Sequence, residues 1–201
     1  MKYLIIAITV LALTGCGQSS EVNSSPSTDT AGQTTNSVNQ TFDSNLENAK
    51  TALSNGNYKQ AITEADQSLA KNPNNAGAYS IRGFAIALNG DIEKGLADTK
   101  KSYELDPNDV ANYYNMAMVY KLGGQLNESK QWFEKVLNKD PNNTWSIYGI
   151  ATIYADQGDD AKALEWLAAA IKIDSSVKAV AAEQDHFERF HGNPTFESLV
   201  H

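Results

Sequence analysis

A spacing of 34 residues between glycines limits the fold of this sequence more than any other feature. The interval separates Gly56, Gly90, Gly124 and Gly158, and it also separates Pro73, Pro107 and Pro141. A fixed period of this length indicates an array in which one small supersecondary unit stacks on the next. We therefore divide the chain into four repeats, 42–75, 76–109, 110–143 and 144–177.

Each repeat has the sequence pattern of two antiparallel helices. Apolar residues follow helical spacing, and small residues recur at the eighth and twentieth positions, where they let two helices approach closely. These positions hold Ala49, Gly83, Ala117 and Ala151, and then Ala61, Gly95, Ser129 and Ala163. The pattern predicts helices and excludes the alternation of β-strands.

Turn and stop residues mark the ends of the predicted helices. The repeated glycines favour a left-handed backbone and therefore end the first helix of each pair. Asn57, Asp91 and Asp159 follow these glycines and are placed to cap the second helix, with Gln125 as the weaker exception. The prolines stop the second helix, because proline restricts the residue before it and cannot continue the helical hydrogen bonds.

The repeats resemble the tetratricopeptide repeat. Segments 79–83 and 113–117 are similar to the aromatic-to-small opening of that family, and segment 105–108 is similar to its closing motif. The resemblance implies an all-α, right-handed α-solenoid of four helical hairpins. Beyond the repeats, Val177 to Phe190 is predicted to form one more amphipathic helix, so that 178–201 supply a C-terminal capping helix and tail.

The first fifteen residues have the order of a secretory signal. Lys2 is followed by a mostly apolar run from Tyr3 to Leu13 and then by small residues before Cys16. Such a run spans only about half a bilayer as a helix, so a permanent membrane span is not expected. Residues 13–16 resemble the lipobox of bacterial lipoproteins, which implies cleavage after residue 15 and a lipid, with acyl chains such as palmitate, on Cys16.

Residues 16–41 are predicted to be a disordered tether. Within 17–41, 17 residues are Ser, Thr, Asn or Gln, and such a segment cannot bury enough apolar surface to offset its ordering entropy. Its expected reach is about 25–30 Å. The mature chain has a formal net charge of −9, because loss of Lys2 lowers the −8 of the full sequence by one, and nucleic acid is therefore not an expected partner.

In the family that the repeats resemble, the first helices line a concave groove that binds protein. The groove residues implied by the resemblance are Phe84, Tyr114, Asn115, Met118, Lys121, Trp145 and Tyr148. Aromatic and methionine side chains contribute strongly at interfaces. An alternative interpretation is that some of them pack between adjacent hairpins. The family variant that clamps a terminal carboxylate is not indicated, because only Asn115 agrees with its set of residues.

Catalytic and metal-binding patterns are weak in this sequence. His186 and His191 are five residues apart, which turns two helical side chains away from each other and does not match a His-Glu-x-x-His zinc site. Asp156, Asp159 and Asp160 do not follow the order of a calcium loop and are interpreted as part of a capped turn. We therefore predict no enzyme, no metal and no cofactor, and keep an envelope enzyme using the two histidines as a minor hypothesis.

Together these features predict a lipid-anchored scaffold that binds a segment of another cell-envelope protein in its groove, in the assembly of an envelope complex. The alternative is a structural component that associates with its own copies, because exposed apolar surface would serve self-association equally well. The expected location is the cell membrane or the outer membrane, with the lipid-anchored protein facing the periplasm or the exterior.

Overall fold

The computed structural model describes residues 43–201, in which ten α-helices and one 3-10 helix follow one another without a strand. The elements are α1 (Ser44–Ser54), α2 (Tyr58–Lys71), α3 (Ala76–Leu88), α4 (Ile92–Leu105), α5 (Val110–Leu122), α6 (Leu126–Lys139), α7 (Thr144–Gln157), α8 (Asp160–Ile173), α9 (Val177–Glu183), η1 (Asp185–Phe190) and α10 (Pro194–Val200). The predicted signal sequence, the tether and Cys16 fall within 1–42 and lie outside the described residues.

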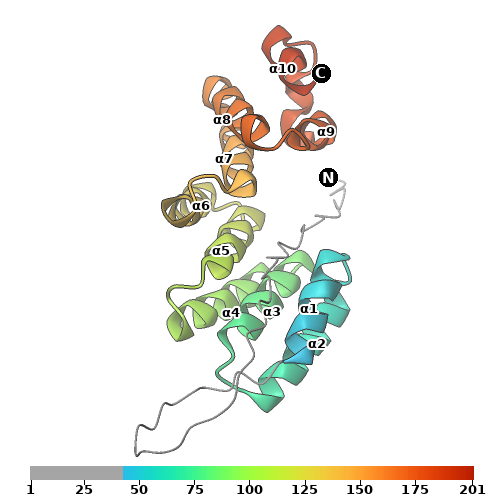
Figure 1. Ribbon diagram of the computed structural model, residues 1–201, viewed down its shortest axis with the longest axis vertical. Helices are drawn as coiled ribbons and strands as arrows, with labels where there is room; N and C mark the ends of the chain where they lie inside the picture. Colours follow the sequence, from blue (N-terminus) through green and yellow to red (C-terminus); the bar gives the residue numbers. More distant parts are fainter. Residues whose placement is uncertain (1–42) are drawn as a thin grey trace, which may run out of the picture.

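The helices are arranged as successive hairpins in a curved array. Figure 1 shows α1 with α2, α3 with α4, α5 with α6 and α7 with α8 following one another along the curve, before α9 and α10 complete the C-terminal end. Helices α5 and α7 lie toward the inner side of this curve, and α6 and α8 lie toward its outer side. The predicted all-α solenoid of paired helices with a C-terminal cap is confirmed.

The turn between the two helices of each hairpin has the predicted backbone. Gly56, Gly90, Gly124 and Gly158 all have positive φ, between 73° and 107°. The Asp91 and Asp159 side chains accept the predicted cap hydrogen bonds, from the backbone N–H groups of Lys94 and Lys162. Asn57 stands at the N-cap of α2 but its side chain makes no cap hydrogen bond, so that part of the prediction is wrong.

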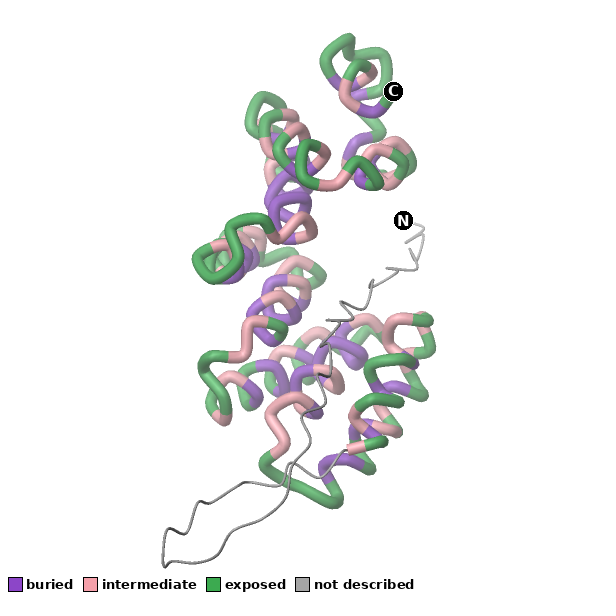
Figure 2. Tube along the Cα trace, viewed as in Figure 1, coloured by how far each residue is buried: buried purple, intermediate pink, exposed green. Residues whose placement is uncertain are grey.

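The core lies between the helices, where small residues and large rings alternate. Figure 2 shows buried residues on the facing sides of the helices and exposed residues at the turns. In the second hairpin α3 and α4 approach so closely that a Cβ built on Gly83 would lie 2.7 Å from the carbonyl oxygen of Gly95. In the third, Phe133 is fully buried against the backbone of Gly149, which leaves room for its ring.

A half-buried arginine ties the first two hairpins together. Arg82 on α3 donates through Nε and Nη2 to the two carboxylate oxygens of Asp98 on α4, at 2.6 and 2.9 Å. Its Nη1 donates to Asp66 on α2 at 2.7 Å. The bidentate pair with Asp98 joins the two helices of the second hairpin, and the contact with Asp66 connects that hairpin to the first.

The closing segment differs from the single helix predicted for Val177 to Phe190. It is helical as α9, becomes extended at Gln184, and continues as the 3-10 helix η1. The change of direction places Phe187 against Tyr148 of α7, with ring centroids 5.9 Å apart, and the rings of Phe190 and Phe196 join the same cluster. Tertiary packing of these rings therefore overrides the helical pattern of the segment.

The closing segment also repeats the turn of the four hairpins. Gly192 lies 34 residues after Gly158 and has a φ of 84°, and the Asn193 side chain then accepts from the first backbone N–H groups of α10. The periodicity of the array therefore extends one turn beyond the four repeats. The first helix of a fifth hairpin would stand here, but it is broken into α9 and η1. The sequence pattern did not predict this break.

Candidate functional site

The predicted groove residues lie on α3, α5 and α7. On α5, Tyr114, Met118 and Lys121 are spaced by four and three residues, which places them on one side of the helix. On α7, Trp145 and Tyr148 share a side for the same reason, and Thr152 continues it. We call the surface formed by these six residues the inner face.

Three of the predicted residues are buried in contacts that hold the array together. Phe84 is 5% exposed and packs against Ala87 and Val119, and Tyr148 is 9% exposed and packs against Phe187 and Trp145. Asn115 is also buried, and its Nδ2 donates to the Ser80 hydroxyl at 2.9 Å. For these three residues the structure shows the packing that the alternative interpretation describes.

The other four predicted residues remain partly accessible: Tyr114, Met118, Lys121 and Trp145. The Tyr114 ring meets Phe133 edge-on, with centroids 5.6 Å apart, so its position is fixed before any partner arrives. Burial raises the pKa of its phenol to about 12. The inner face therefore offers pre-positioned aromatic, thioether and ammonium groups side by side.

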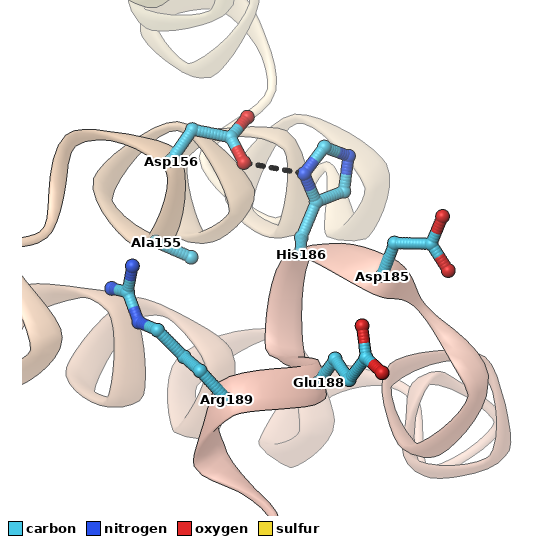
Figure 3. A pocket seen from close by; sticks show the side chains of 6 residues that line it. All are labelled: Ala155, Asp156, Asp185, His186, Glu188 and Arg189. Atoms are coloured by element: carbon cyan, nitrogen blue, oxygen red, sulfur yellow. Dashed lines mark hydrogen bonds and ion pairs between the residues drawn. The ribbon is translucent and has the colours of Figure 1, made fainter. Parts of the chain in front are cut away.

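Lys121 lies between α7 and the closing segment. Its ammonium donates to the Thr152 hydroxyl at 2.5 Å and lies 3.1 Å from Nε2 of His186 on η1. The His186 Nδ1 lies 2.6 Å from the Asp156 carboxylate. Figure 3 shows the two side chains pointing toward each other. Since an ammonium can only donate, Nε2 accepts from Lys121 and the Nδ1–H group donates to Asp156. A hydrogen-bonded chain thus links α5, η1 and α7.

This arrangement could not be read from the sequence. Lys121 and His186 are 65 residues apart, and Asp156 and His186 are 30 apart. The two histidines that are neighbours in the sequence do not share a site, because the exposed His191 lies beside Glu197 and Phe196 instead. Only knowledge that the closing segment folds back onto α7 would have placed His186 beside Lys121.

A shallow pocket of about 390 Å³ opens beside His186. It is lined by Ala155, Asp156, Asp185, His186, Glu188 and Arg189. Arg189 pairs with Asp160, and Asp159 pairs with Lys162 and caps α8, so the aspartates weighed as a calcium loop have other partners. Within residues 43–201, no group of three or more His, Cys, Asp or Glu side chains is arranged to hold a metal ion.

The position of Lys121 predicts a pH dependence of stability. Burial lowers the pKa of its ammonium to about 8, and the Asp156 carboxylate partly opposes this shift. The unfolded chain therefore binds this proton more strongly than the folded chain, and stability rises with pH above about 8. From about pH 7 to 9.5, we expect the free energy of unfolding to rise by about 2 kcal/mol more in the wild-type chain than in Lys121→Met.

Urea titrations at a series of pH values test this difference. Lys130→Met is the matched control, because Lys130 lies on α6, outside the inner face, and contacts Tyr154. It is expected to keep the wild-type rise. Equal pH slopes for wild type and Lys121→Met would show that Lys121 is not held as a buried cation.

Across residues 43–201, none of the helices combines the length and the apolar character that a membrane span requires. The described residues instead match a known repeat family. The model of the N-terminal tetratricopeptide repeat region of psidin matches residues 46–170, more than half of the chain. The chain belongs to the tetratricopeptide repeat family. No curated protein has a significant sequence match to it.

Solved structures with the same fold share little sequence with this tetratricopeptide repeat protein. MamA from Desulfovibrio magneticus RS-1 is 18% identical, covers 77% of this chain and 86% of its own, and superposes with a TM-score of 0.58. A protein from Thermus thermophilus, TTC0263, is also 18% identical, covers 69% and 78%, and has a TM-score of 0.60. YrrB, described as having an unusual peptide-binding site, is 14% identical over 77% and 80%, with a TM-score of 0.54.

Proposed function

We propose that this protein is a lipid-anchored interaction scaffold of the bacterial cell envelope, and that it binds a segment of another envelope protein on its inner face. The observation that carries the proposal is the row of partly accessible side chains on α5 and α7, namely Tyr114, Met118 and Trp145. Their apolar surface is only partly covered by the core. A partner that covers the rest gains hydrophobic burial without having to order the face.

The family assignment supports a protein or peptide as the ligand. YrrB has the same fold and is described as a protein with a peptide-binding site. The array also provides a long, curved and rigid surface, which suits an extended or helical segment better than a small molecule. The shallow pocket beside His186 is open and lined by charges of both signs, so it does not compete with the inner face as a site for a small apolar ligand.

The anchor rests on the order of the first forty residues. A basic start, a short apolar run, small residues, a single cysteine and a polar tether follow one another as in a lipoprotein precursor. Two or three acyl chains hold a protein on a membrane, since each buried CH2 group contributes about 0.8 kcal/mol. The tether then lets the array stand away from the membrane and reach a partner.

Site-specific photocrosslinking in intact cells tests the binding face. A photoreactive residue in place of Trp145 is expected to capture one envelope protein, and the same residue in place of Glu134, exposed on the outer helix α6, is expected to capture none. Tyr114→Gln with Met118→Gln should abolish the capture, and far-UV circular dichroism checks that the variant is still folded, because both side chains also pack against the core. Capture that persists in this double variant would contradict the inner-face assignment, and a crosslink to a second copy would favour self-association.

Replacement of Cys16 tests the anchor separately. Cys16→Ser is expected to remove incorporation of radiolabelled palmitate and to shift the protein from the membrane fraction to the soluble fraction, because no other described or predicted segment holds it on a bilayer. The array itself should keep its helicity, because its helices and core are formed within residues 43–201. Retention of the variant in the membrane fraction after a high-salt wash would contradict the lipid anchor.

A further inference from the structure

Among residues 43–201, the ammonium of Lys121 has no acidic partner of its own. Its polar neighbours among the described residues are a hydroxyl, on Thr152, and an imidazole, on His186. No carboxylate in residues 43–201 lies within ion-pair distance of it. The Asp156 carboxylate contacts His186, whose ring lies between Asp156 and Lys121. A buried charge without a counter-ion costs free energy, and a ligand that brings an anion removes this cost.

The ammonium of Lys121 keeps one hydrogen-bond donor that no acceptor among the described residues uses. Two of the three ammonium N–H groups are used by Thr152 and His186, so the third has no acceptor within residues 43–201. The Tyr148 hydroxyl is buried and has no hydrogen-bond partner within residues 43–201. The pKa of the Tyr148 phenol is raised mainly by burial and further by Tyr114, which lies close to it on α5. Two donors of the inner face, the Lys121 ammonium and the Tyr148 hydroxyl, therefore lack a full set of acceptors within residues 43–201.

We propose that the inner face recognises a partner segment through one Asp or Glu side chain, whose carboxylate pairs with Lys121 while flanking apolar side chains pack on Tyr114, Met118 and Trp145. This inference rests on the proposed function, since it names the chemistry of the segment bound there. The site is shared by α5, α7 and the closing segment, because His186 and Thr152 hold the ammonium in place.

Charge argues for a single carboxylate and against a polyanion. The chain carries a formal net charge of −8, and Asp156 lies on the far side of the His186 ring from Lys121. A phosphate dianion or an acidic run would meet these negative surroundings, whereas one carboxylate neutralises one ammonium. A side chain also reaches the Lys121 amine from a backbone that runs along the face, whereas a terminal carboxylate would have to bring the backbone itself to the amine.

Selection from synthetic peptide libraries tests the inference with the full chain in mild detergent. The probe is a random library of twelve-residue peptides with amidated C-termini, and a second library has free C-termini. We expect amidated peptides bound by the wild-type protein to be enriched in Asp or Glu beside aromatic or aliphatic residues. Selection on Lys121→Met should keep the apolar preference and lose the acidic one, and Lys130→Met should keep both.

A double-mutant cycle on one selected peptide then measures the pair. Glu→Gln in the peptide and Lys121→Met in the protein should each weaken binding about tenfold, and the two together should weaken it no more than either alone. Circular dichroism and thermal unfolding check that Lys121→Met is folded. This variant has lost a buried charge and not a packing group, so it is expected to fold.

Each contrary result overturns a different statement. Wild-type binders without acidic enrichment, or acidic enrichment that survives Lys121→Met, would overturn the carboxylate inference and leave the proposed function standing. Enrichment only in the library with free C-termini would replace the side-chain carboxylate by a terminal one. A wild-type protein that selects no peptide from either library would contradict the proposed function itself.

Discussion

Phe133→Ala is expected to lower the free energy of unfolding by about 3–5 kcal/mol. Phe133 is the largest fully buried side chain of the third hairpin, and it packs against Ala117, Ile150 and Ile153. The cavity left by its ring cannot close, because the facing position on α7 is Gly149, which has no side chain to move in. The expected loss is therefore that of a ring removed from a core that does not collapse around the cavity.

Urea unfolding followed by circular dichroism measures this loss. Gln131→Ala is the matched control, because Gln131 is an exposed residue two positions away on α6, and its free energy of unfolding should change by less than about 0.5 kcal/mol. The ring also supports Tyr114 of the inner face, so Phe133→Ala should weaken partner capture as well. A loss of less than about 1 kcal/mol would show that α6 and α7 are not packed as described.

Gly83→Ala is expected to destabilise the chain by about 2 kcal/mol, even though alanine is normally the better helix former by about 1 kcal/mol. The added Cβ would lie 2.7 Å from the Gly95 carbonyl oxygen and 2.9 Å from side-chain atoms of Asp98 and Thr99. Because the nearest atom belongs to the backbone, helix α4 as a whole must shift. The shift also strains the Arg82–Asp98 pair, which joins the same two helices.

Gly77→Ala on the same helix is the control for this prediction. Its added Cβ would lie 3.3 Å from Cδ2 of Leu46, the end of a flexible side chain, so the neighbour can move aside. We expect its free energy of unfolding to stay the same or to rise by up to about 1 kcal/mol. In thermal and urea unfolding, Gly83→Ala should therefore be destabilised and Gly77→Ala should not, and equal changes would contradict the close approach of α3 and α4.

Comparison of Gly83 with the equivalent residues of the other repeats would wrongly predict that alanine is tolerated there. The other three repeats carry alanine at the equivalent position, in Ala49, Ala117 and Ala151, so the sequence alone suggests that alanine is tolerated. The second repeat differs because Gly95 faces Gly83, and without side chains at these two positions the backbones of α3 and α4 lie too close for a Cβ at either. The distance between two helices depends on the residues that both helices place at the contact. It therefore cannot be predicted from one position in the sequence.

The hairpins and their turns could be predicted because their signals are local. A left-handed glycine, a following cap residue and a proline act within a few residues of where they stand, and a period of 34 residues repeats them often enough to be read. The prediction was wrong for the closing segment, where the helical pattern continues through Gln184 but the backbone breaks. Its phenylalanines pack with Tyr148 on another element, and this packing outweighs local preference.

The sequence by itself determined the repeat, the helices, the turns and the set of residues that an inner face can contain. Only the tertiary structure decided how those residues are used. Phe84, Asn115 and Tyr148 became packing residues, because the curvature of the stack brings neighbouring elements over them. Lys121 became part of a hydrogen-bonded chain, because the closing segment turns back and places His186 between it and Asp156. These contacts join residues 30 or more apart along the chain, and no local pattern encodes them.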